Sequence, residues 1–222
     1  LHLVNQLIDF RRLDVQGHQV NLSYGDIVAY IKSVSSTFAE LSEKKNIRLT
    51  FYSAINELRM EFDEDKMGKI MMNLLSNAFK FTNEGGRVEV HLDLLPASGD
   101  GQPELLEIRV ADTGIGINDD EKEKIFDRFY QVKQTDEHKF GGSGIGLNMV
   151  KEFVLLHKGT VEVHNNTGKG SIFVITIPVN RKMEEEKKVT ITEGKVAVLT
   201  EKQEDLTDMQ GVHEEISVRS TK

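Results

Sequence analysis

One stretch of this 222-residue chain, residues 63–82, constrains the fold more than any other. Its apolar side chains recur at steps of three and four residues, which is the spacing of one buried helix face. They are Met67, Ile70, Met71, Leu74, Ala78 and Phe81, and Asp63 is placed to cap the helix. On a different face, Asn73, Asn77 and Lys80 fall within roughly 60° of one another. Two carboxamides beside an ammonium suit a metal-bound polyphosphate, although Asn and Lys on a helix more often form a solvated stripe.

The composition excludes several classes of protein. A net charge of −8 argues against nucleic acid as a partner, because a phosphate backbone is held mainly by Lys and Arg. The absence of cysteine rules out disulfides and thiolate metal sites. No apolar run approaches the roughly eighteen residues that cross a membrane, so we expect no direct membrane contact. The chain begins without Met and without signal-peptide features, which predicts a cytoplasmic piece of a longer protein.

Helical and strand-like segments are mixed along the chain. Helices are predicted over residues 1–16, 26–45, 63–82, 118–127 and 144–158, the last capped by Ser143. Strands are predicted over residues 47–52, 58–62, 88–95, 105–111, 160–164 and 171–178, with the first two and the last two joined by turns. The last hairpin argues against a wholly parallel sheet. We therefore predict an α/β two-layer sandwich, a mixed sheet of about five strands on about three helices, preceded by a separate helix.

Three glycine-rich segments follow the helix at 63–82. Residues 112–116, Asp-Thr-Gly-Ile-Gly, follow a predicted strand, so a carboxylate stands beside backbone that can approach a flat ring closely. Residues 141–147, Gly-Gly-Ser-Gly-Ile-Gly-Leu, open a predicted helix, where backbone amides favour phosphate oxygens. They match neither a Walker loop nor a dinucleotide fingerprint. Residues 168–173, Gly-Lys-Gly-Ser-Ile-Phe, lead into the last strand and alone indicate only a hairpin turn.

Taken in order, these segments resemble the catalytic, ATP-binding domain of bacterial sensor histidine kinases, in the gyrase, chaperone, histidine kinase and mismatch-repair superfamily. The segments that correspond to the N, G1, F and G2 boxes and to the last glycine turn are residues 73–82, 112–116, 125–130, 142–147 and 168–173. The resemblance implies a catalytic domain over residues 26–180, after a linker at 18–25. Residues 1–17 resemble the second helix of the dimerisation and phosphoacceptor hairpin. Residues 181–222 are mostly polar and charged, with two short strand-like runs at 189–192 and 195–200, and are expected to be a tail or a linker toward a possible receiver domain.

The resemblance also implies roles for single residues. Asn77 would coordinate Mg²⁺ on the phosphates of ATP, Asn73 would support the metal shell, and Lys80 would lie along the phosphates. Asp112 would accept a hydrogen bond from the adenine amine, with Ser171 close to it. The other expected ATP-binding residues are Gly114, Gly116, Gly142, Ser143, Gly144, Ile145, Gly146 and Leu147.

A loop over residues 131–142 would close over ATP as a lid. Phe126 and Phe129 would anchor its base or dock on the helical domain, or they would simply be core aromatics. Many of these kinases carry Arg where this chain has Gln131, so the γ-phosphate contact is expected from Arg128, from Lys133 or from elsewhere.

Asn73 decides between the branches of the superfamily. The gyrase, mismatch-repair and chaperone ATPases that the chain resembles carry a glutamate there, which activates water. An amide cannot take that proton, so the resemblance implies a kinase in which Asn73 and Lys80 serve transfer of the γ-phosphoryl group to a histidine. That histidine would lie on a dimerisation helix outside this chain, because His2 and His18 are wrongly placed.

The expected partners are a second copy through the N-terminal helix, the histidine-bearing helix and a receiver domain, within a sensor anchored in the inner membrane. Two alternatives stay open: a nucleotide-sensing module that performs no transfer, and an independent ATPase of the gyrase or chaperone type.

Overall fold

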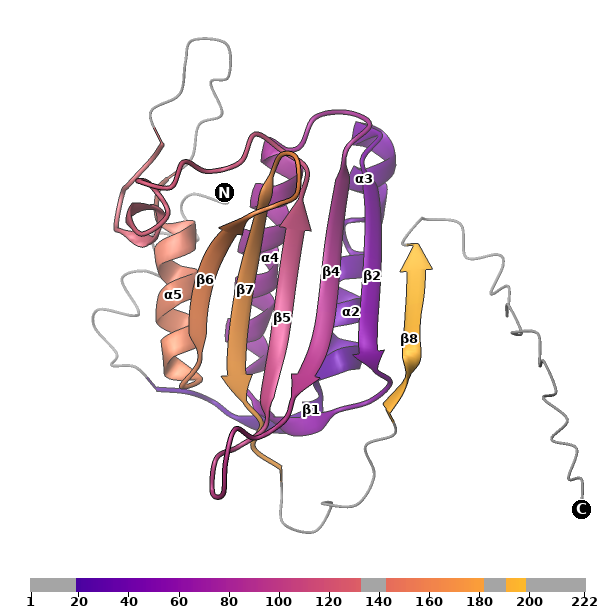
Figure 1. Ribbon diagram of the computed structural model, residues 1–222, viewed down its shortest axis with the longest axis vertical. Coiled ribbons are helices and arrows are strands. Elements are labelled where there is room, and N and C mark those ends of the chain that lie inside the picture. Colours follow the sequence, from indigo (N-terminus) through magenta and orange to yellow (C-terminus); the bar gives the residue numbers. More distant parts are fainter. Residues whose placement is uncertain (1–18, 133–142, 182–190, 199–222) are drawn as a thin grey trace, which may run out of the picture.

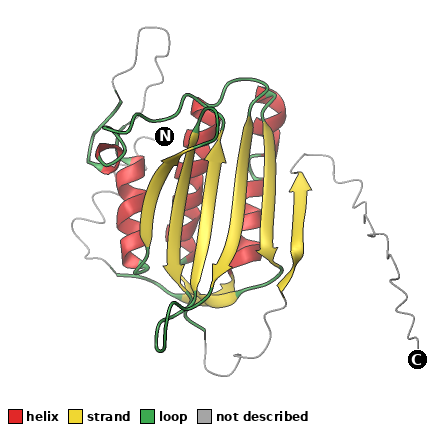
Figure 2. Ribbon diagram, in the orientation of Figure 1, coloured by secondary structure: helices red, strands yellow, loops and turns green. Residues whose placement is uncertain are grey.

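The computed structural model describes residues 19–132, 143–181 and 191–198 (Figure 1). In this part of the chain, helices cover one face of a mixed sheet (Figure 2). The two-layer α/β sandwich predicted from the sequence is therefore confirmed. The helix predicted over residues 1–16 and most of the predicted lid lie outside the described residues. None of the described helices is long and apolar enough to span a membrane.

The main sheet has six strands in the order β6-β7-β5-β4-β2-β8. The strands are β2 (Arg48–Ile55), β4 (Arg87–Leu95), β5 (Leu105–Asp112), β6 (Thr160–Asn165), β7 (Ser171–Pro178) and β8 (Ile191–Val198). Only β2 and β4 are parallel, and every other neighbouring pair is antiparallel. Five of these strands are the predicted ones. The sixth, β8, lies in the predicted tail and includes most of its two strand-like runs; it pairs antiparallel with the edge of β2.

The longest described helix is α4 (Glu64–Phe81), and the prediction for residues 63–82 is confirmed. Oδ1 of Asp63 accepts the backbone N–H of Lys66 at 3.0 Å, which is the expected cap. The buried set differs in one respect, because Phe79 and Leu75 are buried whereas Phe81 is only half-buried. α4 contacts the sheet as well as α2 and α5, so its buried arc is wider than a single stripe.

The helix predicted over residues 26–45 is two helices, α2 (Ile27–Ser36) and α3 (Ala39–Lys45). The break lies at Phe38, whose backbone leaves the helical region. Its ring is buried and stacks on Phe79 of α4, with centroids 5.6 Å apart. Burial of this ring stabilises the break. The helical pattern of the sequence does not reveal this contact with α4, so it predicted one continuous helix.

Three further predictions need correction. The predicted connector contains β1 (Ser23–Asp26), which pairs with β3 (Arg59–Phe62) in a separate small sheet, so the strands predicted at 47–52 and 58–62 are not partners. The helix predicted over residues 118–127 is mostly turns, with one 3-10 turn at Lys124–Phe126. A helix of this length is only marginally stable, and Ile125 and Phe126 are buried here without a regular helix.

α5 (Gly146–Leu156) begins two residues later than predicted. Gly144 has a φ of 68°, a left-handed conformation that keeps Ser143 out of the helix. The hydroxyl of Ser143 accepts the N–H of Ile145 at 3.3 Å, so it closes a local turn rather than capping α5. The residue at the cap position is Ile145, whose side chain makes no capping hydrogen bond.

Candidate nucleotide-binding site

The polar face of α4 is present as the sequence predicted. Asn73, Asn77 and Lys80 are all half-buried. The Nδ2 group of Asn73 donates to the carbonyl of Lys69 at 2.8 Å, one turn earlier, so the amide oxygen is the atom that a cation would approach. Burial lowers the pKa of Lys80, and its ammonium lies 4.8 Å from the centre of the Phe81 ring. A partly desolvated cation of this kind favours an anionic ligand.

Asp112, the last residue of β5, lies in the polar interior of the site and is only 5% exposed. Both of its side-chain hydrogen bonds go to Oδ1, from the N–H of Gly114 at 2.8 Å and from the N–H of Ser171 at 3.3 Å. Among the described residues none donates to Oδ2, which leaves that oxygen for a ligand. Burial raises the pKa of Asp112, and the two hydrogen bonds only partly oppose this shift. Such a carboxylate gains from a hydrogen-bond donor.

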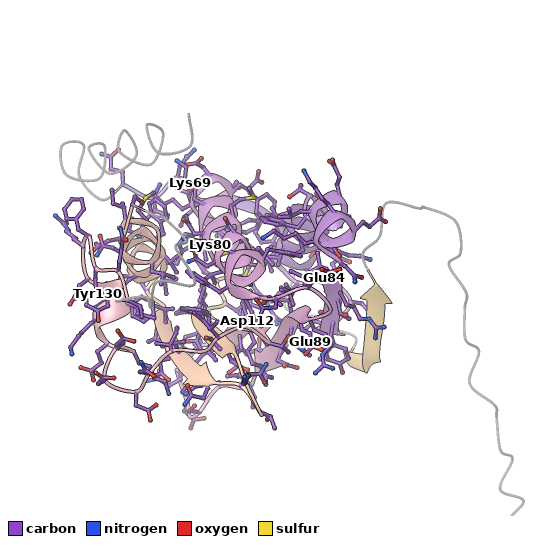
Figure 3. The ribbon with its side chains drawn as sticks, turned by 90° about the horizontal axis from the view of Figure 1, so that it is seen from above. Lys69, Lys80, Glu84, Glu89, Asp112 and Tyr130 are labelled. Carbon is purple, nitrogen blue, oxygen red and sulfur yellow. The ribbon has the colours of Figure 1, made fainter. Side chains whose placement is uncertain are left out.

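Two glycines allow the backbones of three elements to approach closely around Asp112. A Cβ at Gly114 would lie 2.4 Å from the carbonyl oxygen of Phe81, so the end of α4 packs directly on the loop after β5. A Cβ at Gly170 would lie 1.9 Å from the carbonyl oxygen of Asp112. No side chain fits at either position, and glycine is therefore required by close approach of the backbone. Figure 3 views this edge from above, with Lys80 on α4 and Asp112 at the end of β5 labelled.

The turn before α5 contacts a different part of the chain. The N–H of Phe129 donates to the carbonyl of Gly144 at 2.9 Å, and a Cβ at Gly144 would lie 2.7 Å from the backbone of Phe129. Ile145 is buried, and Leu147 packs against the core. Gly116, with a φ of 79°, would place a Cβ 3.5 Å from the carbonyl of Gly170. Gly142 lies outside the described residues.

The two aromatic residues between these segments have different environments. Phe126 is buried and packs edge-on against Phe173 of β7 at 6.4 Å, so it is a core residue. Phe129 is 61% exposed and has a φ of 62°, which is unusual for a bulky side chain. Phe126 is therefore a core aromatic, whereas Phe129 is not, and its role at the lid or in docking stays a prediction.

Two asparagines near the site carry contacts that sequence reasoning missed. The Nδ2 group of Asn166 donates to the carbonyl of Asp112 at 2.8 Å, and that of Asn148 donates to the carbonyl of Phe126 at 3.0 Å. Asn148 is buried on the inward face of α5, and a polar residue at an apolar position of the helical period was a signal that could have been read. Asn166 lies in a turn, where an asparagine carries no comparable signal.

The oxygen atoms of this site suit a hard cation only if a bound ligand supplies further oxygens. The described residues contain no group of three or more His, Cys, Asp or Glu side chains that could hold a metal ion. On the polar face formed by Asn73, Asn77 and Lys80, the oxygen donors are the two amides. Mg²⁺ takes oxygen ligands, keeps several waters and is commonly shared with substrate phosphates, so these amides fit an ion that arrives with a polyphosphate.

Residues 62–181 match the family model described as histidine kinase-, DNA gyrase B- and HSP90-like ATPase. This match covers more than half of the chain. The chain belongs to this ATPase family, as its fold and its ordered motifs indicate.

Similar curated proteins are histidine kinases. The chain is 38% identical over 185 residues to hybrid signal transduction histidine kinase D of Dictyostelium discoideum, covering 83% of the chain and 12% of that protein. It is 39% identical over 182 residues to sensor histidine kinase TmoS of Ectopseudomonas mendocina, covering 81% and 18%. It is 33% identical over 186 residues to sensor histidine kinase WalK of Bacillus subtilis, covering 84% and 30%. The chain thus spans less than a third of the length of these relatives.

Solved structures agree on the fold. Full-length ShkA in complex with AMPPNP has a TM-score of 0.68 at 26% identity, covering 82% of this chain and 36% of that one. The nucleotide-free catalytic domain of histidine kinase ThkA has a TM-score of 0.62 at 25% identity, covering 72% of this chain and 97% of that domain.

Proposed function

We propose that this chain is the ATP-binding catalytic part of a sensor histidine kinase, which transfers the γ-phosphoryl group of ATP to a histidine in two-component signalling. The three curated relatives are named histidine kinases, and the similar structure of ShkA contains AMPPNP. The observation in this chain that carries the proposal is Asn73, because it replaces the base that a hydrolytic relative needs.

Adenine recognition is assigned to Asp112. Its Oδ2 would accept the exocyclic amine of the purine, while the N–H groups of Gly114 and Ser171 hold Oδ1 in place. Backbone without side chains at Gly114 and Gly116 would allow the ring to lie close to the loop. A guanine carries a carbonyl oxygen at the corresponding position, and two facing oxygens would repel each other.

Phosphate binding is assigned to α4 and to the start of α5. Lys80 would lie along the phosphates as a point charge, and Asn77 would hold Mg²⁺, with Asn73 supporting its water shell. The first turn of α5 receives no hydrogen bond from a capping side chain, so the backbone amides near Gly146 suit phosphate oxygens. Gly142, Ser143, Gly144, Ile145 and Leu147 complete the proposed phosphate-binding segment, and the loop over residues 131–142 is the proposed lid.

Transfer rather than hydrolysis is supported by the lack of a base beside Asn73 on the described polar face of α4. Asn73 cannot accept a proton at neutral pH, and its neighbours one turn away on this face are Lys69 and Asn77. The protein's contribution is then to position the triphosphate and stabilise its charge, with Asn73 and Lys80 as the catalytic residues. The nucleophile would be an imidazole on a separate helix.

The proposed partners are this histidine-bearing helix, a second copy of the chain joined through residues 1–17, and a receiver domain of a response regulator. We assign the catalytic domain to residues 26–180 together with β1 from the predicted linker and β8 from the predicted tail, because both pair with strands of this domain. The rest of residues 181–222 is the proposed connection toward a possible receiver. We propose that this domain lies on the cytoplasmic side of a sensor anchored in the inner membrane, as the family resemblance implies; two relatives are named sensor histidine kinases.

The proposal is tested by mixing the chain with a fragment that carries the acceptor helix, in the presence of Mg²⁺ and labelled ATP. Acid-labile phosphohistidine on the fragment is the expected product, and Asn73→Ala should reduce it. Tight ATP binding without transfer, even within the full-length protein, would favour a nucleotide-sensing module instead. Steady phosphate release by the chain alone, abolished by Asn73→Ala, would show an ATPase and refute the argument from the missing base.

A further inference from the structure

A buried histidine joins the end of α5 to the beginning of α4. His157 is 8% exposed, and its Nδ1 lies 2.7 Å from the carbonyl oxygen of Phe153. Its Nε2 lies 3.1 Å from the backbone nitrogen of Asp63, 94 residues away in the sequence. A carbonyl only accepts and a backbone N–H only donates, so the proton must sit on Nδ1 and Nε2 must accept. The contact therefore requires the neutral ring in one tautomer.

This contact lies at the opposite ends of α4 and α5 from the nucleotide site. α4 begins beside His157 and ends at Phe81, which packs on Gly114 in the site. α5 begins at the Gly144 turn and ends at His157, so the two helices run in opposite directions (Figure 1). The helices pack against each other along the way. The hydrogen bond from Asp63 thus fixes one end of a helix pair whose other end holds the proposed ligand groups.

We propose that His157 is a positioning residue, which sets the angle between α4 and α5 and thereby the spacing of the two sides of the nucleotide site. This inference rests on the proposed function, since it assumes that nucleotide binds between Lys80 and the start of α5. The lever is long. α4 has 18 residues and is about 27 Å in length, so a rotation of about 5° at its beginning moves its far end by about 2 Å. A displacement of about 1 Å in such a site can cost about a hundredfold in rate.

Two substitutions separate the hydrogen bond from the volume of the side chain. His157→Gln keeps an accepting oxygen at a similar reach, whereas His157→Leu keeps apolar bulk without an acceptor. The control is His164→Leu, which removes an exposed histidine of β6 that pairs with Glu162 at 3.2 Å. By calorimetry, we expect Mg-ATP affinity to fall about tenfold in His157→Leu and to stay within about threefold of the starting protein in His157→Gln and in the control.

Rescue by a different acceptor gives a readout that a merely structural role does not move. His157→Gln and His157→Ala both remove the ring, but only glutamine offers an oxygen that can accept the Asp63 N–H. We expect Mg-ATP affinity to be largely retained in His157→Gln and to fall in His157→Ala. If the leucine variant does not fold, this comparison decides: rescue by glutamine supports the proposal, and equal affinities of the two variants overturn it.

The tautomer can be tested without nucleotide. Nitrogen-15 NMR of the imidazole at neutral pH should show the proton on Nδ1, and a proton on Nε2 would overturn the assignment. If the chain does not bind Mg-ATP at all, the proposed function and the positioning role both fail, while the NMR result still shows whether His157 accepts the hydrogen bond from Asp63. Unchanged affinity in His157→Leu, with binding intact in the starting protein, would refute the positioning role alone.

Discussion

Gly170→Ala and Gly168→Ala form a matched pair that measures how tightly Asp112 is enclosed. Both glycines have positive φ, 106° and 87°, so both substitutions carry a backbone cost of roughly 1–2 kcal/mol. A Cβ at Gly168 meets nothing within 4 Å. A Cβ at Gly170 would lie 1.9 Å from the carbonyl oxygen of Asp112, about 1.6 Å short of an ordinary contact of about 3.5 Å. Its three nearest neighbours are backbone atoms, so no rotamer change relieves the clash.

Relief requires the start of β7 to move away from β5. That movement breaks the hydrogen bonds from the N–H of Ser171 and from Asn166 to Asp112, which are worth roughly 2 kcal/mol together. Overpacking adds roughly 1–3 kcal/mol. We therefore expect Gly170→Ala to be less stable than Gly168→Ala by about 3–5 kcal/mol, or by roughly 6–20 °C in Tm for a domain of this size.

Urea unfolding followed by circular dichroism gives the free energy of unfolding of both variants, and calorimetry gives their Mg-ATP affinities. Gly168→Ala should retain most of the affinity, and Gly170→Ala should lose at least tenfold. Equal stability of the two variants, or normal nucleotide binding by Gly170→Ala, would refute the reasoning that backbone contact at this glycine shapes the Asp112 environment.

The remaining predictions concern single side chains. Asp63→Ala should cost about 1–2 kcal/mol, because it removes the cap of α4. Burial acts to raise the pKa of Asp63, but hydrogen bonds from Lys66 and from the Asn21 N–H outweigh it and hold the pKa below its usual value. This stabilisation is present above the unfolded pKa of about 3.9 and is lost as the pH falls through the folded pKa; matching acid-unfolding curves for Asp63→Asn and the starting protein would contradict it. Asp112 has a raised pKa from burial, so its ionised form is a cost to stability that is present above the folded pKa and relieved in acid. Asp112→Asn should therefore bind ATP at least tenfold more weakly at neutral pH without loss of Tm, and a large fall in Tm with normal affinity would reverse the assignment. Asn77→Ala should weaken binding of ATP in the presence of Mg²⁺ and change it little when EDTA is present; equal affinities with Mg²⁺ would remove Asn77 from the site.

The parts of the site that sequence predicted are those in which one short segment carries its own signal. The cap and polar face of α4 follow from helical spacing, and the Asp112 and Ser171 segments carry glycines beside chemistry-bearing residues. The prediction that these segments meet in one site came from their order, which matches that of a known family. The residue spacing within each segment does not predict it.

The parts that sequence did not predict depend on contacts between distant segments. The break at Phe38 lies where its ring stacks on Phe79, and β1 forms in the predicted connector because β3 pairs with it. His157 meets Asp63 across 94 residues, and a histidine at the end of an amphipathic helix is unremarkable until the fold brings them together. Tertiary contact overrides local preference at each of these places.

The enclosure of Asp112 has a consequence for biosynthesis. Its Oδ1 is held by an amide of β7, 59 residues further along, so the carboxylate proposed to recognise the purine has its final geometry only after the last inner strand of the main sheet is in place. A nascent chain still lacking residues 171–178 at the ribosome exit would carry α4 and β5 but no finished receptor for the base. Cellular ATP would then begin to favour the native state by mass action only once translation has passed Pro178, late in the making of this domain.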